Sequence, residues 1–287
     1  MKRHLFLLSL LLFALSAVAQ SADSVAFVNA KRNPLKIKGA KGYTVAVELF
    51  DAPQNISVFK YSPKRFTTDI VQTNELTPVS VVAKRCDAAL AINACFWNVR
   101  TVLPKTFVKS NGKVLSLTDS SCYPYVNGLV FLHDKEIDVL HSLAMPDYKG
   151  LVEGCDDVFA SGPLLIEGGK SYDYDYCRNA EDEELRLLRK LCLRRHPRSV
   201  IGYDDKGNIY LVVVDGRSRG NAEGMTMSEL TALCRWMGMV EAVNLDGGGS
   251  SALWSCKHGI INHPSDNKRF DHEGERKVSS CIVVRRR

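Results

Sequence analysis

Two short segments of this chain combine the residue types that bind charged groups and exchange protons. Asp246 follows an apolar stretch that includes Ala242 and Val243, and it precedes three glycines and two serines at residues 247–251. Asp215 directly follows the apolar run 209–214 and precedes Gly216 and Arg217. Carboxylates, guanidinium groups and closely spaced backbone N–H groups are suited to proton transfer and anion binding. We therefore expect a ligand site at these two segments, and a structural Asp–Arg ion pair is the alternative for Asp215.

The run Gly247, Gly248 and Gly249 needs an explanation, because glycine loses more backbone freedom on folding than any other residue. A positive φ, a close approach of N–H groups to a ligand, or an anion-binding nest beside Asp246 would offset that cost. A tight turn is the plainer alternative. The serine that follows, Ser250, adds a hydroxyl to the same predicted site.

A third polar group follows the apolar run 88–92. Asn93 ends this run, and Phe96 and Trp97 come shortly after it. Amides and aromatic faces at the end of a buried strand are typical of sugar sites, although both rings could equally belong to the core. We assign Asn93 to ligand binding.

Two further segments are candidates for ligand contact. Residues Ser161 and Gly162, with the proline that follows them, interrupt an apolar run, which indicates either a bulge or a kink that faces a ligand. Arg198 begins the strand predicted to pair with the strand that ends at Asp215, and its planar guanidinium suits a phosphate or a carboxylate. His196 could donate a proton, but a single histidine before proline is more often structural.

A helix is predicted to connect the two aspartates. Thr226 and Glu229 fit a capping box, and apolar residues recur at helical spacing up to Gly238. Glu229 then has a structural role. If this helix joins two parallel strands, Asp215 and Asp246 emerge at the same edge of one sheet.

The remaining pattern indicates an α+β fold, a single large domain of mixed β-sheets with flanking helices. Strands are predicted at 42–50 and 57–61, as a hairpin at a sheet edge with a break at 51–55, and at 128–132, 137–141, 158–160, 199–203 and 209–214, the last of these central. A turn is predicted at 133–135, a short helix at 78–85, and a helix at 179–195 with an acidic start and a basic end. We interpret the charges of this last helix as a solvated face.

The first residues predict export. Lys2 and Arg3 precede an apolar segment that ends in an Ala17-Val18-Ala19 cleavage site, so residues 1–19 fit a signal peptide. The segment is too short for a membrane span and no later stretch is long enough, which predicts a periplasmic or secreted protein. Loss of this leader lowers the net charge from +6 to +4, too mild a charge to indicate nucleic-acid binding.

Nine cysteines make an odd number for an oxidising compartment, so at least one is free or pairs with another molecule. Their spacing fits no metal site. Burial as small apolar side chains is expected for Cys234 and Cys281. Their pairing is left open.

Taken together, these motifs resemble the phosphodiester glycosidase family, in order, from about residue 88 to 285. The segments that carry the resemblance are Asn93-Ala94-Cys95-Phe96, Ser161-Gly162-Pro163, His196-Pro197-Arg198-Ser199-Val200-Ile201-Gly202, Val213-Val214-Asp215-Gly216-Arg217, Gly224-Met225-Thr226 with Glu229-Leu230, Asn244-Leu245-Asp246-Gly247-Gly248-Gly249-Ser250-Ser251, Asn262-His263-Pro264 and Glu275-Arg276-Lys277-Val278. Cys95 and Trp97 stand where the family often has glycine and phenylalanine, and the helix at 179–195 looks like an insertion.

The resemblance implies a hydrolase that cleaves a sugar-1-phosphodiester, such as an N-acetylglucosamine-1-phosphodiester of a phosphorylated glycan, at the anomeric carbon. Asp215 and Asp246 would be the catalytic carboxylates. Arg198, Arg217 and the backbone of 247–249 would stabilise the phosphate, while Asn93, Ser161 and Ser250 would hold hydroxyl or phosphate oxygens, next to Gly162 and Gly216. The domains expected are the leader 1–19, a β-rich segment 20–87 packed on the main domain, and a glycosidase domain 88–287.

Two other functions remain open. One is a phosphoglycan-binding protein that uses the same groups without turnover. The other is a metal-dependent phosphodiesterase in which Asp215 and Asp246 are ligands and the P–O bond breaks. No cofactor is implied, and a divalent metal is left open.

Overall fold

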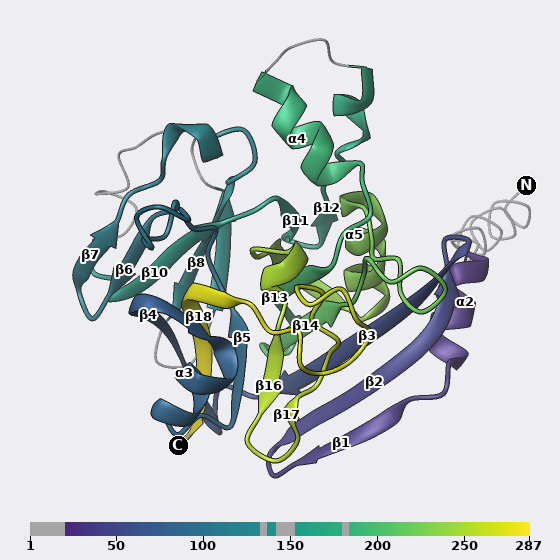
Figure 1. The fold of residues 1–287 in the computed structure, drawn as a ribbon, viewed down its shortest axis with the longest axis horizontal. Coiled ribbons are helices and arrows are strands. Elements are labelled where there is room, and N and C mark those ends of the chain that lie inside the picture. The colour runs from purple at the N-terminus through teal and green to yellow at the C-terminus, as the bar shows by residue number, and fades with distance from the viewer. Residues whose placement is uncertain (1–20, 133–136, 142–152, 180–183) are drawn as a thin grey trace, which may run out of the picture.

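The computed structural model describes residues 21–132, 137–141, 153–179 and 184–287 (Figure 1). The predicted leader 1–19 and the predicted turn 133–135 lie outside these residues. The α-helices described are α2 (Ala22–Asn29), α3 (Val79–Arg85), α4 (Glu184–Cys192) and α5 (Met227–Trp236). Short 3-10 helices are η1 (Ser120–Cys122), η2 (Asp175–Asn179) and η3 (Gly248–Ser250). None of the helices in this part of the chain is long and apolar enough to cross a membrane.

Three β-sheets form the body of the protein. The central sheet has the strand order β1 (Asn33–Ile37), β2 (Ala40–Leu49), β3 (Ala52–Tyr61), β14 (Ile209–Val214), β13 (Arg198–Asp204), β15 (Met239–Asn244), β11 (Leu164–Glu167) and β12 (Lys170–Ser171). The second sheet has the order β7 (Lys113–Ser116), β6 (Val108–Ser110), β10 (Asp157–Ser161), β8 (Gly128–Leu132) and β9 (Ile137–His141). The third has the order β17 (Gly259–Ile260), β16 (Leu253–Ser255), β5 (Leu90–Asn93), β18 (Lys277–Arg286) and β4 (Phe66–Pro78).

The central sheet is buried on both faces, which is why its inner strand β14 is apolar throughout. Successive side chains of a strand point to opposite faces, so Val200 and Val212 join a core with α2, α4 and α5. Their neighbours Ile201 and Leu211 join a second core with residues of the other two sheets. The helix α3 covers the third sheet in a smaller core of its own. This arrangement agrees with the α+β class predicted from the sequence.

The sheets are not mixed, and the prediction was wrong on this point. Every strand pairing among the described residues is antiparallel. The reason is that α5 carries the chain past β13, so β15 pairs with β13 and not with β14. Because β13 is antiparallel to both neighbours, β14 and β15 still point the same way. Asp215 and Asp246 therefore emerge at the same edge of the sheet, as predicted.

The N-terminal hairpin differs from its prediction in two respects. Its turn is only Phe50 and Asp51, both with φ near +55°, and β3 begins at Ala52. The hairpin also lies inside the sheet, because β1 adds to β2 and β14 adds to β3. The polar residues Gln54 and Asn55 had suggested a loop, but they belong to the strand.

Other predicted elements are confirmed. The helix α3 lies within the range expected for it, and the capping box of Thr226 and Glu229 is present at the start of α5. The described part of the charged helix is α4, and residues 180–183 lie outside the description. All nine cysteines are free thiols, and Cys234 and Cys281 are buried as expected.

Candidate active site

The glycine loop after β15 is fastened to two neighbouring strands at the sheet edge. Its first residue, Asp246, donates its backbone N–H to the carbonyl oxygen of Ala94 (2.9 Å), just after β5. The N–H of Gly248 donates to the carbonyl oxygen of Pro197 (2.8 Å), just before β13. Backbone contacts across the central and third sheets thus fix the position of this loop.

Asn93 is buried and supports the glycine loop through a hydrogen bond. Its Nδ2 donates to the backbone oxygen of Asp246 (2.6 Å), and its Oδ1 accepts from the Ser199 hydroxyl (2.8 Å) and from the N–H of Ala252 (3.2 Å). Both ends of the amide are therefore used inside the protein. The structure places Asn93 as a positioning residue, not at a ligand surface as the sequence suggested.

The segment around Ser161 and Gly162 has a similar supporting place. The Ser161 hydroxyl donates to the backbone oxygen of Asn244 (2.8 Å), whose own Nδ2 donates to the oxygen of Gly162 (2.8 Å). A Cβ on Gly162 would collide with the backbone oxygen of Tyr125. The interruption seen in the sequence is the point where the chain leaves β10 in the second sheet and enters β11 in the central sheet.

Arg198 is 1% exposed and does not reach the site predicted for it. Its guanidinium donates to the backbone oxygens of Met225 (2.7 Å), Leu191 (2.7 Å) and Arg194 (2.8 Å). Two of these carbonyls lie at the end of α4, where helix carbonyls lack partners within the helix. Arg198 therefore joins α4 to the start of β13, and the expectation of an anion contact is corrected.

Asp215 is 1% exposed and is paired with a histidine that we did not predict. Its Oδ2 lies 2.8 Å from Nδ1 of His263 and accepts from Nδ2 of Asn55 (2.7 Å). Its Oδ1 accepts from the N–H of His263 (2.9 Å) and from Nδ2 of Asn262 (3.1 Å). The partners of Asp215 are thus His263, Asn55 and Asn262, and not the arginine considered from the sequence. Both of its carboxylate oxygens have protein partners.

His263 is the exposed end of this pair. Its ring stacks between Phe270, at 3.9 Å between centroids, and His272, at 4.4 Å. Its side chain is 20% exposed, and no partner for Nε2 is recorded among the described residues. In the tautomer that donates from Nδ1 to this carboxylate, Nε2 is the acceptor. Nδ2 of Asn55 also lies 3.1 Å from Nδ1.

Two arginines border the glycine loop. A Cβ on Gly248 would lie 2.7 Å from Nη2 of Arg217, and a Cβ on Gly249 would lie 2.5 Å from Nη2 of Arg276. Gly248 also has φ of +62°, which glycine adopts readily. A side chain at Gly248 or Gly249 would therefore displace a guanidinium group from the loop. At Gly247 and Gly216 the obstacle is different, since a Cβ on either would lie 2.7 Å from the backbone of Pro197.

Two guanidinium groups and two carboxyl groups lie around this loop. Arg276 is paired with Asp266 (Nη2 to Oδ1, 2.5 Å). Burial, followed by the charge of Arg276, lowers the pKa of Arg217, while Asp266 and Asp246 act in the opposite direction. The two guanidinium groups are therefore close enough for the charge of one to act on the other.

Asp246 is only partly exposed, and burial raises its pKa to about 6. The Ser250 hydroxyl, the charge of Arg276, the N–H of Gly247 and the Trp97 indole all act against this rise. The half-buried Trp97 therefore lies against the carboxylate, whereas Phe96 packs edge-on against Tyr125 in the core. A carboxyl group with this pKa changes its protonation state close to neutral pH.

Sequence reasoning missed His263, Arg276, Asp266 and Asn55. His263 and Arg276 fall in segments that carry the family resemblance, which was the available signal. Asn55 was read as a loop residue, and nothing local marks Asp266. Among the described residues, no group of three or more His, Cys, Asp or Glu side chains is placed to hold a metal ion.

An α+β fold that brings a carboxylate, a glycine loop and two arginines to one sheet edge defines a candidate enzyme for anionic substrates. The chain belongs to the phosphodiester glycosidase family, whose model matches residues 87–285. The resemblance noted from the sequence is thereby confirmed.

Several relatives are similar over part of their length. The uncharacterized protein YomE of the SPbeta prophage in Bacillus subtilis is 29% identical over 204 residues, which cover 68% of this chain and 28% of that protein. The N-acetylglucosamine-1-phosphodiester alpha-N-acetylglucosaminidases of mouse and human are 26% and 27% identical over 135 residues, or 47% of this chain and 25% of theirs. The chain thus matches about a quarter of the length of these relatives.

Solved structures share the fold. A hypothetical protein from Synechocystis matches 90% of this chain and 64% of its own, with a TM-score of 0.68 and 16% identity. The catalytic domain of the zebrafish N-acetylglucosamine-1-phosphodiester alpha-N-acetylglucosaminidase, auto-inhibited by its pro-peptide, matches 90% of this chain and 83% of its own, with a TM-score of 0.63 and 16% identity.

Proposed function

We propose that this protein is an exported glycosidase that hydrolyses a sugar-1-phosphodiester at the anomeric carbon. The products are the free sugar and a phosphomonoester. An N-acetylglucosamine-1-phosphodiester of a phosphorylated glycan is the proposed substrate, in line with the names of the mammalian relatives. The observation that carries the proposal is the position of Asp246 between the glycine loop, Arg217 and Arg276.

The phosphate is proposed to bind at the two arginines. Arg217 and Arg276 each lie against one glycine of the loop, so a bound phosphate can reach both guanidinium groups. When the glycosidic C–O bond breaks, negative charge grows on this phosphate, and fixed positive charges stabilise the transition state. A phosphate leaving group held this way needs little help from a general acid.

Asp246 is proposed to face the anomeric carbon as a carboxylate. Positive charge develops on this carbon in the oxocarbenium-like transition state, and an adjacent carboxylate stabilises it. With a pKa of about 6, Asp246 is mostly ionised at neutral pH. The partly exposed Trp97 beside it supplies an apolar face for the sugar ring.

His263 is proposed to take a proton from the attacking water through Nε2. Asp215 fixes the ring and its tautomer by accepting from Nδ1, so it acts as a positioning residue and not as a group that touches the sugar. This assignment changes the role first given to Asp215, because both of its oxygens already have protein partners.

Hydrolysis in oxygen-18 water tests the reaction directly. With a methyl phosphodiester of N-acetylglucosamine 1-phosphate, we expect label on the anomeric oxygen, with and without chelator. Label on the phosphate, together with loss of turnover when chelator is added, would instead support the metal-dependent phosphodiesterase. Binding without turnover of any sugar-1-phosphodiester would support the phosphoglycan-binding alternative.

Export is proposed from the leader pattern at 1–19, for a periplasmic or secreted protein. The test is N-terminal sequencing of protein recovered outside the cytoplasm, which is expected to begin at Gln20. A chain that keeps Met1 and stays in the cytoplasm would contradict it.

A further inference from the structure

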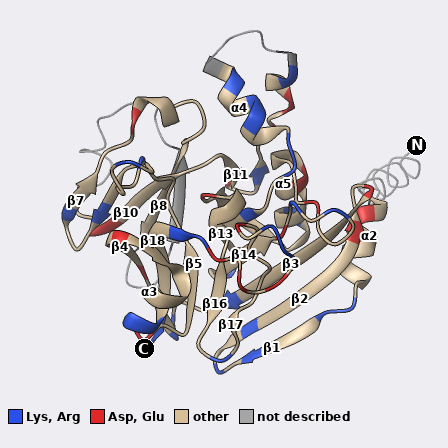
Figure 2. Cartoon of the chain, viewed as in Figure 1, with Lys and Arg blue, Asp and Glu red and all other residues tan. Residues whose placement is uncertain are grey.

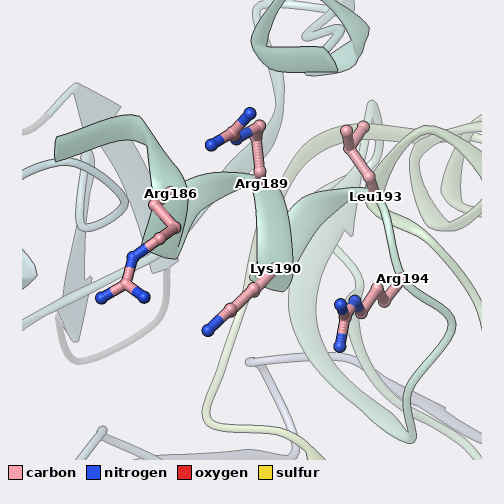
Figure 3. Close-up of a pocket in the computed structure, with 5 residues that line it drawn as sticks. All are labelled: Arg186, Arg189, Lys190, Leu193 and Arg194. Atoms are coloured by element: carbon pink, nitrogen blue, oxygen red, sulfur yellow. The ribbon is translucent and has the colours of Figure 1, made fainter. Parts of the chain in front are cut away.

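A row of basic side chains lies along α4 and the residues just after it. Arg186, Lys190 and Arg194 are spaced four residues apart, and Figure 3 shows them pointing to the same side, while Arg189 and Leu193 point the other way in this view. These five residues line a surface cavity with a volume of about 250 Å³. Figure 2 shows α4 as a segment rich in Lys and Arg that projects from the body of the molecule. We call these five residues the α4 basic cluster.

Basic residues in the last turn of α4 interact favourably with the helix dipole, but the positive charges of this row also repel one another. Like charges four residues apart on a helix repel each other, at a cost of about 0.2–0.5 kcal/mol per pair. Among the ion pairs recorded for the described residues, none involves Arg189, Lys190 or Arg194. A bound anion would relieve this repulsion.

The α4 basic cluster lies close to the glycine loop along the chain. Arg194 is three residues before Pro197, so their Cα atoms are at most about 11 Å apart. Pro197 accepts the hydrogen bond from Gly248, and Arg198 ties the carbonyl of Arg194 to the start of β13. This short segment joins the cluster to the sheet edge that carries Asp246.

The pKa of His196, which lies in this segment, reflects the same proximity. Burial, followed by the charges of Arg198 and Arg217, lowers the pKa of His196 to about 4, and the charge of Arg194 acts in the same direction. Arg217 borders the glycine loop and Arg194 belongs to the cluster. His196 is thus close to one arginine of each group of positive charge.

We propose that the α4 basic cluster binds further phosphate groups of the substrate, so that the preferred substrate is a chain of sugar phosphates and not a single small phosphodiester. The proposal rests on the proposed function. One phosphate occupies Arg217 and Arg276, and the next phosphates along the chain contact Lys190, Arg194 and their neighbours. Arginine forks bind phosphate through paired hydrogen bonds, and an open cavity suits a flexible polymer.

A lipid surface is the weaker partner for this cluster. Helices that bind membranes keep an exposed apolar face opposite their basic face. On α4 the apolar residues Leu188 and Cys192 are only 1% exposed, because they pack into the core with α5. Leu187, at 47% exposed, is the well exposed large apolar residue of α4.

The variant Lys190→Glu/Arg194→Glu tests the proposal, since both side chains are exposed. The matched control is Lys41→Glu/Lys64→Glu, also exposed, in a second basic cavity of about 390 Å³. That cavity lies at the opposite edge of the central sheet, where β14 begins. Both variants change the net charge equally.

Two substrates are compared, the methyl phosphodiester and an oligomer of phosphodiester-linked N-acetylglucosamine 1-phosphate. For the oligomer we expect kcat/KM to fall about tenfold in the α4 variant, mainly through KM. For the methyl ester it should stay within about twofold of wild type, and the control variant should match wild type on both. Equal losses on both substrates, or no loss on either, would overturn the proposal.

Binding of inorganic polyphosphate and of anionic phosphatidylglycerol vesicles separates this proposal from the proposed function. If the wild type turns over neither substrate but binds polyphosphate, and the α4 variant alone loses that binding, the proposed function fails and the anion-binding surface stands. If vesicle binding is lost in the α4 variant while polyphosphate binding is unchanged, the cluster is a lipid-binding surface and the proposal fails.

Discussion

Nδ1 of His263 lies 2.8 Å from Oδ2 of Asp215, although 48 residues separate them in the sequence. Asp215 follows the central strand β14, whereas His263 lies in the loop between β17 and β18. The backbone N–H of His263 donates to the same carboxylate, so both the main chain and the ring are held. This pairing makes Asp215 a support for the more exposed imidazole ring.

The first prediction concerns Asp215→Asn. The amide can donate to Nδ1 of His263, which would favour the wrong tautomer, so we expect kcat to fall by about 10³-fold or more. Binding of the substrate should change little. Steady-state kinetics measure kcat, titration of the variant with substrate measures binding, and near-UV circular dichroism checks that the fold is intact.

The matched control for this pair is His272→Asn, which removes the outer stacking ring but not the contact with Asp215. We expect a loss of less than about tenfold in kcat, since a ring contact contributes about 0.5–1.5 kcal/mol. Activity of Asp215→Asn equal to wild type would remove the pair from the mechanism.

The second prediction concerns the pH dependence of Asp246. Because it acts as a carboxylate, kcat/KM should fall as the pH drops below the pKa of about 6. A rate that instead rises as the pH drops through 6 would assign it the role of a proton donor. The measurement is a pH profile of kcat/KM between pH 4 and 8.

Asp246 also predicts a pH-dependent cost to stability. Its folded pKa of about 6 lies above the ordinary value of 3.8, so the folded state holds this proton more tightly than the unfolded state. This contribution is therefore absent below about pH 4 and destabilises the fold increasingly up to about pH 6, by up to about 3 kcal/mol. Asp246→Asn should abolish turnover yet raise Tm by several degrees at pH 8, with little change at pH 4, as thermal melts would show.

The third prediction concerns the two arginines. Arg217→Ala and Arg276→Ala should each lower kcat/KM for the phosphodiester by about 10²–10³-fold, because each removes positive charge from the leaving phosphate. Arg285→Ala is the control, since it breaks a surface ion pair with Asp69 on β4. It should leave the kinetics unchanged, and losses equal to those of Arg217→Ala would mean a general effect of charge.

The fourth prediction compares two of the three glycines. Gly249→Ala displaces the side chain of Arg276, so we expect KM to rise with only a small change in Tm. Gly247→Ala meets the backbone oxygen of Pro197 at 2.7 Å, and backbone moves less easily than a side chain. We expect this variant to lose about 1–3 kcal/mol of stability. Identical effects of the two substitutions on KM and Tm would contradict this difference.

The fifth prediction concerns Arg198→Met. Loss of the guanidinium leaves three backbone oxygens without their donor, which should cost about 2–5 kcal/mol of unfolding free energy. Chemical denaturation measures this cost. KM of the folded enzyme should not change, and a raised KM with unchanged stability would return Arg198 to the substrate site.

Local sequence patterns determined much of the architecture. Thr226 and Glu229 marked the start of α5, and the apolar runs before Asp215 and Asp246 marked two buried strands, because capping and burial depend on neighbouring residues. The same edge for both aspartates followed from one helix between two strands. The glycine run marked the loop, since three glycines in succession are costly without a reason.

Only the tertiary structure decided which polar residues face the site and which support it. Asn93, Ser161 and Arg198 had the residue types of ligand contacts, but each fills the hydrogen-bonding needs of buried backbone at a strand or helix end. Asn55, His263 and Arg276 come from distant segments, and hydrogen bonds or close approaches across the sheet edge bring them to Asp215 and the glycine loop. Residue type thus indicated the chemistry of this protein, while long-range packing decided which residue performs it, because a polar side chain cannot serve a ligand once buried backbone or a neighbouring side chain has used its hydrogen bonds.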